Sequence, residues 1–214
     1  MGVLDKRSRD DPRRHATEHA FLRATEALLT EGSSFADLNV RRVAERAGRT
    51  RTAFYAHFED RRELLLALLD EAAGEGLAAI GPFLAGDGPV GRDELAASLR
   101  GLLETMRRHA VLVRAVVEAA SYDDRIASYW DGVIGRFVES TRHRLHAEGL
   151  GADEATATAT ALCWMNERTC YQQAVRGGTG LDDDRAVAAL VEVWWSVLLA
   201  ARAGSEDRAR PRGR

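Results

Sequence analysis

Arginines gather between Arg41 and Arg62, and their number and spacing point to a chemical role. The segment holds seven arginines against three acids, Glu45, Glu59 and Asp60, so its formal charge is +4 in a chain whose total is −3. Local positive charge attracts phosphate and favours contact with nucleic acid. A surface hairpin with a solvated charged side has the same composition, so charge alone leaves both interpretations open.

Two short helices that would present these arginines are predicted between Leu38 and Phe58. Asn39 can cap the first helix, and Gly48 ends it, because glycine adopts the left-handed conformation that turns the backbone sharply. The predicted apolar face of this first helix consists of Val40, Val43, Ala44 and Ala47.

The second helix is capped by Thr50 and carries Phe54 and Phe58 four residues apart, so one of its faces is predicted to be buried. The residues left outside are Arg51, Thr52, Ala53, Tyr55 and His57. Two helices joined by a short glycine turn form the helix-turn-helix unit, whose second helix enters the major groove of DNA.

Other residues that carry chemistry in proteins form no convincing site. Cys163 and Cys170 lie seven positions apart in one predicted helix, a separation of about 10 Å that is too long for a disulfide. His143 and His146 stand one helical turn apart, but the arginines beside them favour a solvated face over a metal site. The sequence contains no glycine-rich phosphate loop, nucleophile elbow or paired-histidine zinc motif, so we expect no enzyme activity, cofactor or metal.

Length and composition indicate a soluble globular protein. The chain has 214 residues, of which 45% are hydrophobic and 29% charged, enough for a substantial core. No apolar run approaches the roughly 20 residues that span a bilayer, and the charged N-terminus lacks the apolar core of a signal peptide. We therefore expect a cytoplasmic location and no membrane partner.

Four segments are predicted along the chain: a disordered basic arm (1–16), a three-helix DNA-binding domain (17–62), a helical domain (63–203) and a disordered tail (204–214). Pro12 is expected to stop any early helix. The basic residues of the arm are Lys6, Arg7, Arg9, Arg13 and Arg14. Such arms can lie along DNA, but a purely solubilising role is the favoured interpretation.

The helical domain completes an all-α fold of about nine helices, since no β-rich segment interrupts it. Apolar periodicity predicts helices over 61–79, 93–109, 111–119, 124–148, 153–176 and 182–203. The glycines and prolines of 81–89 predict the clearest loop of the sequence and a possible domain boundary.

The segment VRRVAERAGRTRTAFYAHFEDRRELL, with a helix before it and helices after it, resembles the TetR family of bacterial transcriptional regulators. The AERAG turn and the FYAHF segment are its most specific parts. Within that family, MNERT at 165–169 and LVEVWW near the C-terminus resemble the branch of the ethionamide-resistance repressor EthR. The resemblance implies a homodimer that binds the two halves of a palindromic operator and is released by a small effector in the C-terminal domain.

Carried over to this sequence, the resemblance implies phosphate contacts by Thr50, Tyr55, His57 and Arg61. It also implies base-edge contacts by Arg51, Thr52 and Ala53. Arg49 stands where the family usually has a small apolar residue, so it either loosens the packing of the turn or adds a phosphate contact. Arg61 replaces the common lysine and adds a planar guanidinium.

A ligand pocket is predicted around Asn166, because a buried amide needs partners that a ligand carbonyl can supply. Asn166 bonding to a neighbouring helix is the structural alternative. Where the EthR branch has another pocket asparagine this chain has Cys163, which indicates a largely apolar or different effector. The resemblance implies that the pocket is lined by Leu102, Met106, Trp130, Ile134, Phe137, Thr141, Cys163, Asn166 and Trp194.

The last two long helices are expected to form the dimer interface, with Val187, Val191 and Trp195 as candidate contacts. The favoured hypothesis is a repressor that an effector releases from its operator. An effector-independent regulator or an activator of the same fold is the alternative, and a helical enzyme is the third. The operator sequence, the regulated genes and the identity of the effector lie beyond the sequence.

Overall fold

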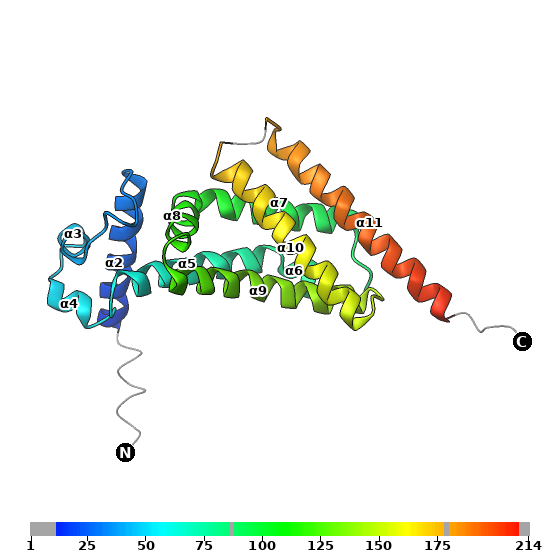
Figure 1. The fold of residues 1–214 in the computed structure, drawn as a ribbon, viewed down its shortest axis with the longest axis horizontal. Helices are drawn as coiled ribbons and strands as arrows, with labels where there is room; N and C mark the ends of the chain where they lie inside the picture. Colours follow the sequence, from blue (N-terminus) through cyan, green and yellow to red (C-terminus); the bar gives the residue numbers. More distant parts are fainter. Residues whose placement is uncertain (1–11, 86–87, 178–179, 210–214) are drawn as a thin grey trace, which may run out of the picture. The chain divides into compact units, whose positions relative to one another are not determined.

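The structure, a computed structural model, describes residues 12–85, 88–177 and 180–209, and most of these residues lie in helices. No strand occurs in these residues, which confirms the all-α prediction. The helices are α2 (Pro12–Thr30), α3 (Val40–Arg46), α4 (Arg51–Tyr55), α5 (Arg61–Ala79), α6 (Gly81–Ala85), α7 (Arg92–Arg108), α8 (Ala110–Ala120), α9 (Asp124–Ala147), α10 (Ala152–Ala174) and α11 (Asp183–Ala209) (Figure 1).

Three predicted segments are more helical than expected. Helix α2 begins at Pro12, so residues 12–16 are not a disordered arm. Proline is tolerated in the first turn of a helix, where its missing N–H has no intrahelical partner. Helix α11 continues through 204–209, and α6 occupies the start of the predicted loop. Residues 1–11, 86–87 and 210–214 of these predicted segments lie outside the described residues.

The chain forms two compact units. The first unit runs to Glu71 and includes Val111–Tyr129, and the second comprises Ala72–Ala110 and the chain from Trp130 onward. Helix α8 and the start of α9 therefore belong to the same unit as the helix-turn-helix. The sequence instead predicts a boundary at residue 62, with α8 in the C-terminal domain.

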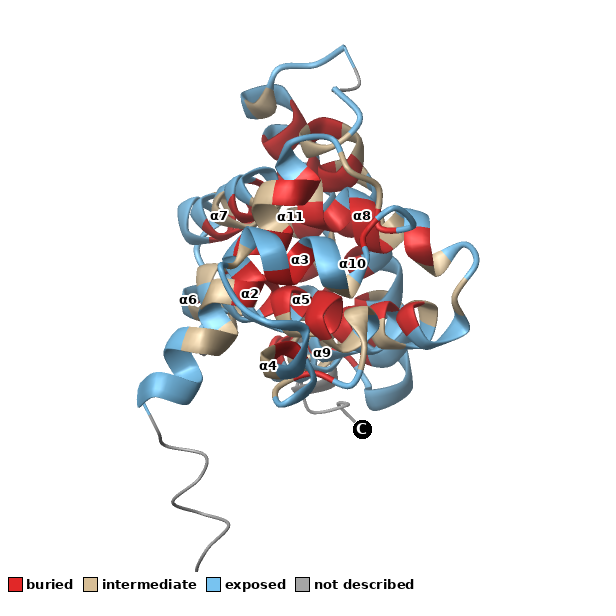
Figure 2. Ribbon diagram, turned by 90° about the vertical axis from the view of Figure 1, so that its left-hand side faces the viewer, coloured by how far each residue is buried: buried red, intermediate tan, exposed pale blue. Residues whose placement is uncertain are grey.

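The core of the second unit lies where α7 packs against α10 and α11. Buried and exposed residues alternate along single helices, as Figure 2 shows. The α6 residue Phe83 meets Trp194 of α11 edge to face, with ring centroids 5.4 Å apart. Val187 and Val191 are buried in this core, so their predicted place in a dimer interface is wrong. Trp195 is partly buried and lies under the Arg202 guanidinium.

A buried ion network closes this unit at the C-terminal end of α9. The Glu148 carboxylate accepts hydrogen bonds from Arg144, from the Arg202 Nε (2.6 Å) and from the Val90 N–H (3.1 Å). Arg202 also donates to the Val90 carbonyl (2.9 Å) and Arg144 to that of Gly88 (2.5 Å). Burial raises the pKa of Glu148, but the bonds from Arg202, Val90 and Arg144 outweigh burial and hold it below 4.5.

Glu148→Gln is expected to lower the free energy of unfolding at pH 7 by on the order of 3 kcal/mol, because the buried guanidinium of Arg144 and the half-buried one of Arg202 lose their counter-charge. The carboxylate is stabilising above its unfolded-state pKa, and this contribution is lost as pH falls through the lowered folded-state pKa. The difference between wild type and variant should therefore shrink below pH 4.5. Urea unfolding across pH measures it. Glu104→Gln, at an exposed position of α7, is the control, and an equal effect there contradicts the role of the network.

Candidate functional site

The helix-turn-helix is built by local contacts of the kind that the sequence predicts. The Asn39 side chain accepts the Arg42 N–H (3.0 Å) at the start of α3, and Thr50 accepts the Ala53 N–H (3.0 Å) at the start of α4. Between them Gly48 has a φ of 62°, in the left-handed region. The predicted caps and turn are thus confirmed.

Helix α4 is held in place by an aromatic cluster, Phe21, Phe54 and Phe58. Phe21 meets Phe54 edge to face at 5.3 Å and Phe58 at 6.2 Å, and Phe54 and Phe58 lie 5.5 Å apart. All three rings are buried. A helix of five residues is not stable by itself, so this packing fixes which residues α4 exposes.

The exposed side of α4 carries most of the residues predicted to meet DNA. Arg51 and Thr52 are exposed and Tyr55 has 54% of its surface accessible, whereas Ala53 is half-buried. The Tyr55 ring leans edge-on against Phe54 with centroids 5.5 Å apart, which limits its freedom. These side chains therefore present a guanidinium, a hydroxyl and a phenol from one short, fixed helix.

His57 lies closer to the core than predicted. Its ring is half-buried against Phe21 and Phe58, with centroids 6.3 and 6.4 Å away. Its Nδ1 atom is buried and has no hydrogen-bond partner among the described residues. Burial, followed by the nearby charge of Arg14, holds the pKa of His57 below 6.5. His57 therefore favours its neutral form near pH 7.

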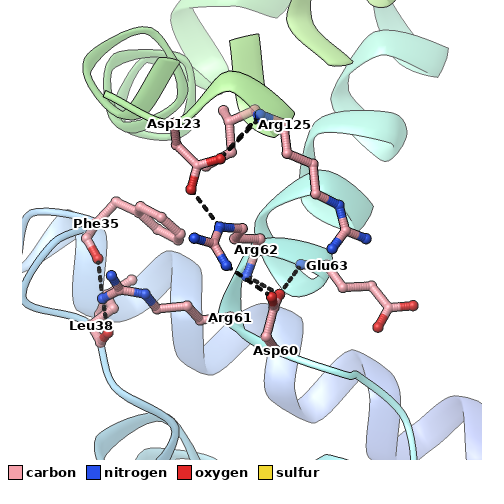
Figure 3. A network of polar contacts seen from close by, with 9 residues as sticks. Phe35, Leu38, Asp60, Arg61, Arg62, Glu63, Asp123 and Arg125 are labelled. Atoms are coloured by element: carbon pink, nitrogen blue, oxygen red, sulfur yellow. Dashed lines mark hydrogen bonds and ion pairs between the residues drawn. The ribbon is translucent and has the colours of Figure 1, made fainter. Parts of the chain in front are cut away.

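Some arginines of the segment are neutralised by acids. Arg41 pairs with Glu45 at 2.8 Å, and Arg46 pairs with Glu31 at 2.5 Å. Arg62 bonds to Asp60 and to Asp123 of the α8–α9 turn, within the same compact unit (Figure 3).

Other arginines keep their charge available. Arg42, Arg49 and Arg51 form no ion pair with any residue that the structure describes, and all three are exposed. Arg42 is not among the residues predicted from the sequence to contact DNA. The signal was present, since Arg41 has an acid four residues ahead whereas Arg42 has Arg46.

Arg49 does not loosen the turn. Its side chain is exposed and donates only to the Gly48 carbonyl (3.3 Å) among the described residues. Val43 and Ala44 behind it are fully packed. The remaining hypothesis for Arg49 is therefore a phosphate contact.

Arg61 occupies a different place from the one predicted (Figure 3). Its Nη1 donates to the carbonyls of Phe35 (3.1 Å), Ala36 (2.9 Å) and Leu38 (2.6 Å), and the guanidinium lies 4.8 Å above the Phe35 ring. The side chain thus ties the start of α5 to the segment between α2 and α3. This geometry supports a positioning role and not the predicted phosphate contact.

The predicted pocket residues lie in the second unit, and several of them touch. The Cys163 thiol lies 3.5 Å from the Thr141 hydroxyl, which joins α10 to α9. The Trp194 indole N–H donates to the Asn166 side-chain oxygen at 3.1 Å, which joins α11 to α10. This second bond is the structural alternative foreseen for Asn166.

The α5 residue Gly76, which is not among the predicted pocket residues, faces two of them. A Cβ at Gly76 would lie 3.2 Å from the Phe137 ring and 3.6 Å from the Leu102 side chain. The absence of a side chain there leaves room for both. Met106 packs against the core of the unit, and Trp130 and Ile134 are buried on α9.

One cleft, of about 370 Å³, lies away from these residues at the junction of α7, α10 and α11. It is lined by Arg107, Gln173, Ala174, Gly177, Leu181 and Asp183. Arg107 bonds to Asp183 at 2.8 Å, and the Gln173 amide donates to the Leu181 carbonyl at 3.1 Å. The polar groups of this cleft already bond to one another, so we interpret the cleft as a packing junction between helices and not as a ligand site.

Two family models match the chain. Residues 21–68 match the bacterial regulatory proteins of the tetR family, and residues 95–200 match the C-terminal domain of the transcriptional regulator EthR. The HTH-type transcriptional regulators EthR of Mycobacterium tuberculosis (strain H37Rv) and Mycolicibacterium smegmatis are each 28% identical over 183 residues. The alignments cover 83% and 82% of this chain and 84% and 83% of those proteins, respectively.

Solved structures show the same fold. A proposed TetR-family transcriptional regulator from Syntrophomonas wolfei has a TM-score of 0.71 at 13% identity. The match covers 86% of this chain and 95% of that protein. A transcriptional regulator from Rhodococcus sp. Rha1 has a TM-score of 0.65 at 20% identity, with 97% and 88% covered, respectively.

Arg49→Ala and Arg61→Met are expected to act on different quantities. Loss of a phosphate contact at residue 49 should reduce the slope of log affinity against log salt by about 1 for each copy bound to DNA. Loss of the carbonyl contacts at residue 61 should lower the free energy of unfolding by about 2 kcal/mol and leave the slope unchanged. DNA titrations at several salt concentrations and urea unfolding measure the two. A changed slope for Arg61→Met would restore its predicted phosphate contact.

Proposed function

The chain belongs to the TetR family of bacterial regulatory proteins, and we propose that it represses transcription as a homodimer on a palindromic operator. The family and the relatives are transcriptional regulators, not enzymes, in agreement with the expectation from the sequence. The observation that carries the proposal is the exposed side of α4, with unpaired arginines beside it. A regulator meets its DNA operator in the bacterial cytoplasm, so the proposal agrees with the expected cytoplasmic location.

We assign the roles at the DNA interface from the exposure of each side chain and from the polar groups that it does not use within the protein. Arg51, Thr52 and Ala53 meet base edges, because they stand on the exposed or half-buried side of the recognition helix. Thr50, Tyr55 and His57 contact phosphates, and Arg42 and Arg49 add charge to that contact. Arg61 holds the helix-turn-helix in position.

Selection of bound fragments from genomic DNA tests this function directly. We expect enrichment of a palindrome whose half-sites lie about one helical turn apart, or a multiple of it, because two recognition helices enter successive major grooves. Footprinting of the enriched fragments locates the half-sites. Enrichment of a single, non-repeated half-site, or of no sequence, would contradict the proposal.

The dimer is supported by apolar surface that the single chain leaves uncovered. Trp164 of α10 and Val193 and Leu199 of α11 are 39%, 44% and 50% exposed. By length and composition alone α11 could also cross a membrane, contrary to the expectation from the sequence, although core helices of soluble proteins pass the same test. Only 39% of its apolar window is buried. We infer that a second copy covers these exposed side chains, which replace the wrong candidates Val187 and Val191 as interface residues.

The double variant Val193→Glu/Leu199→Glu is expected to be a folded monomer, because two charges would be buried at the proposed interface. Light scattering coupled to size-exclusion chromatography measures the mass. Tyr122→Glu changes an equally exposed residue of the other compact unit and should leave the dimer intact. A double variant that remains dimeric would place the interface elsewhere.

We place the effector beside Asn166 and the neighbouring pocket residues. Because Trp194 occupies the Asn166 oxygen, the amide N–H groups are what Asn166 can offer to a ligand carbonyl. The contacts of Cys163 with Thr141, and of Gly76 with Phe137 and Leu102, bring an apolar lining together. If the Asn166–Trp194 bond only joins α10 to α11, the alternative of an effector-independent regulator is favoured.

A further inference from the structure

The carboxyl group of Glu167 is buried without hydrogen-bond partners. The residue is 4% exposed, and neither of its carboxylate oxygens accepts a hydrogen bond within the part of the chain that the structure describes. Arg168 stands 3.6 Å away as an ion pair, but its own side chain is largely exposed and its guanidinium lies over the Tyr171 ring. Burial raises the pKa of Glu167, and the Arg168 charge only partly opposes this.

An arrangement of this kind destabilises the folded chain. Buried carboxylates are normally paired and hydrogen-bonded, because an unsatisfied charged group loses its hydration without compensation. The fold gives no reason for the two unbonded oxygens of the Glu167 carboxylate. A ligand that donates hydrogen bonds to them explains them better.

Glu167 lies one helical turn after Cys163, a residue of the predicted pocket. Cys163 and Glu167 are four residues apart and share one face of the helix, and Cys163 touches Thr141 of α9.

We propose that Glu167 binds the protonated amine of an apolar effector, whose hydrocarbon body lies along the same face of α10, against Cys163 and its neighbour Thr141. The ammonium N–H groups donate to the two free carboxylate oxygens and supply the counter-charge that Arg168 gives only at a distance. Asn166, the preceding residue, contributes amide donors to a second polar group. This inference rests on the proposed effector-binding role of the domain.

Three probes of equal chain length test the assignment on the full-length protein: decylamine, 1-decanol and decanoate, measured by calorimetry at pH 7. Decylamine is expected to bind about tenfold more tightly than 1-decanol, with decanoate weakest, because only the amine brings a positive donor to the carboxylate. Equal affinities of amine and alcohol for the wild-type protein would overturn the inference without any variant.

Glu167→Gln should bring decylamine to the affinity of 1-decanol and leave 1-decanol unchanged, and Glu104→Gln should alter neither. Without ligand, Glu167→Gln should unfold at the same or a higher temperature, because it removes a buried charge. A lower unfolding temperature with unchanged decylamine affinity would mean a structural role and overturn the inference.

The proposed function and the inference fail in different ways. If none of the three probes binds while operator binding is intact, the effector-binding role fails and the inference with it. If all three bind alike, the pocket stands and the role of Glu167 fails.

Discussion

Burial of Phe54 between Phe21 and Phe58 is the interaction on which the DNA-facing surface depends. Helix α4 has five residues, too few to be stable alone, and no disulfide or metal is available to brace it in the described chain. Its orientation is set by the aromatic cluster on one side and by the Thr50 cap at its start. Because these contacts leave only one side of α4 exposed, they also decide that Arg51, Thr52 and Tyr55 face outward together.

Charge in the first unit is divided between structure and binding. Arg61 and Arg62 hold the start of α5 through carbonyls and carboxylates, whereas Arg42, Arg49 and Arg51 keep their charges exposed. Counting all seven arginines of the segment as a DNA footprint therefore overstates it. The free arginines supply long-range attraction to phosphate, and the paired ones keep the two short helices in place.

Local features of the fold were predictable from the sequence, whereas features that depend on distant partners were not. The caps at Asn39 and Thr50 and the turn at Gly48 need only neighbours within a few residues, so the sequence predicts them. The carbonyl partners of Arg61 lie 23 to 26 positions away, which no local pattern specifies. The same applies to Val187 and Val191, since periodicity shows that a helix has an apolar face but not whether α7 or a second chain covers it. The burial of Glu167 could not be predicted either, because its sequence neighbours Asn166 and Arg168 are polar and its burial depends on distant elements.

The central claim is that the exposed side of α4 and its free arginines form the interface with DNA. It is tested most directly by the salt dependence of operator affinity for the wild-type protein. With three free arginines in each of two protomers, log affinity should fall linearly with log salt. The loss should be about a thousandfold between roughly 50 and 200 mM. An affinity that stays flat over this range would contradict a phosphate-led interface built on these residues.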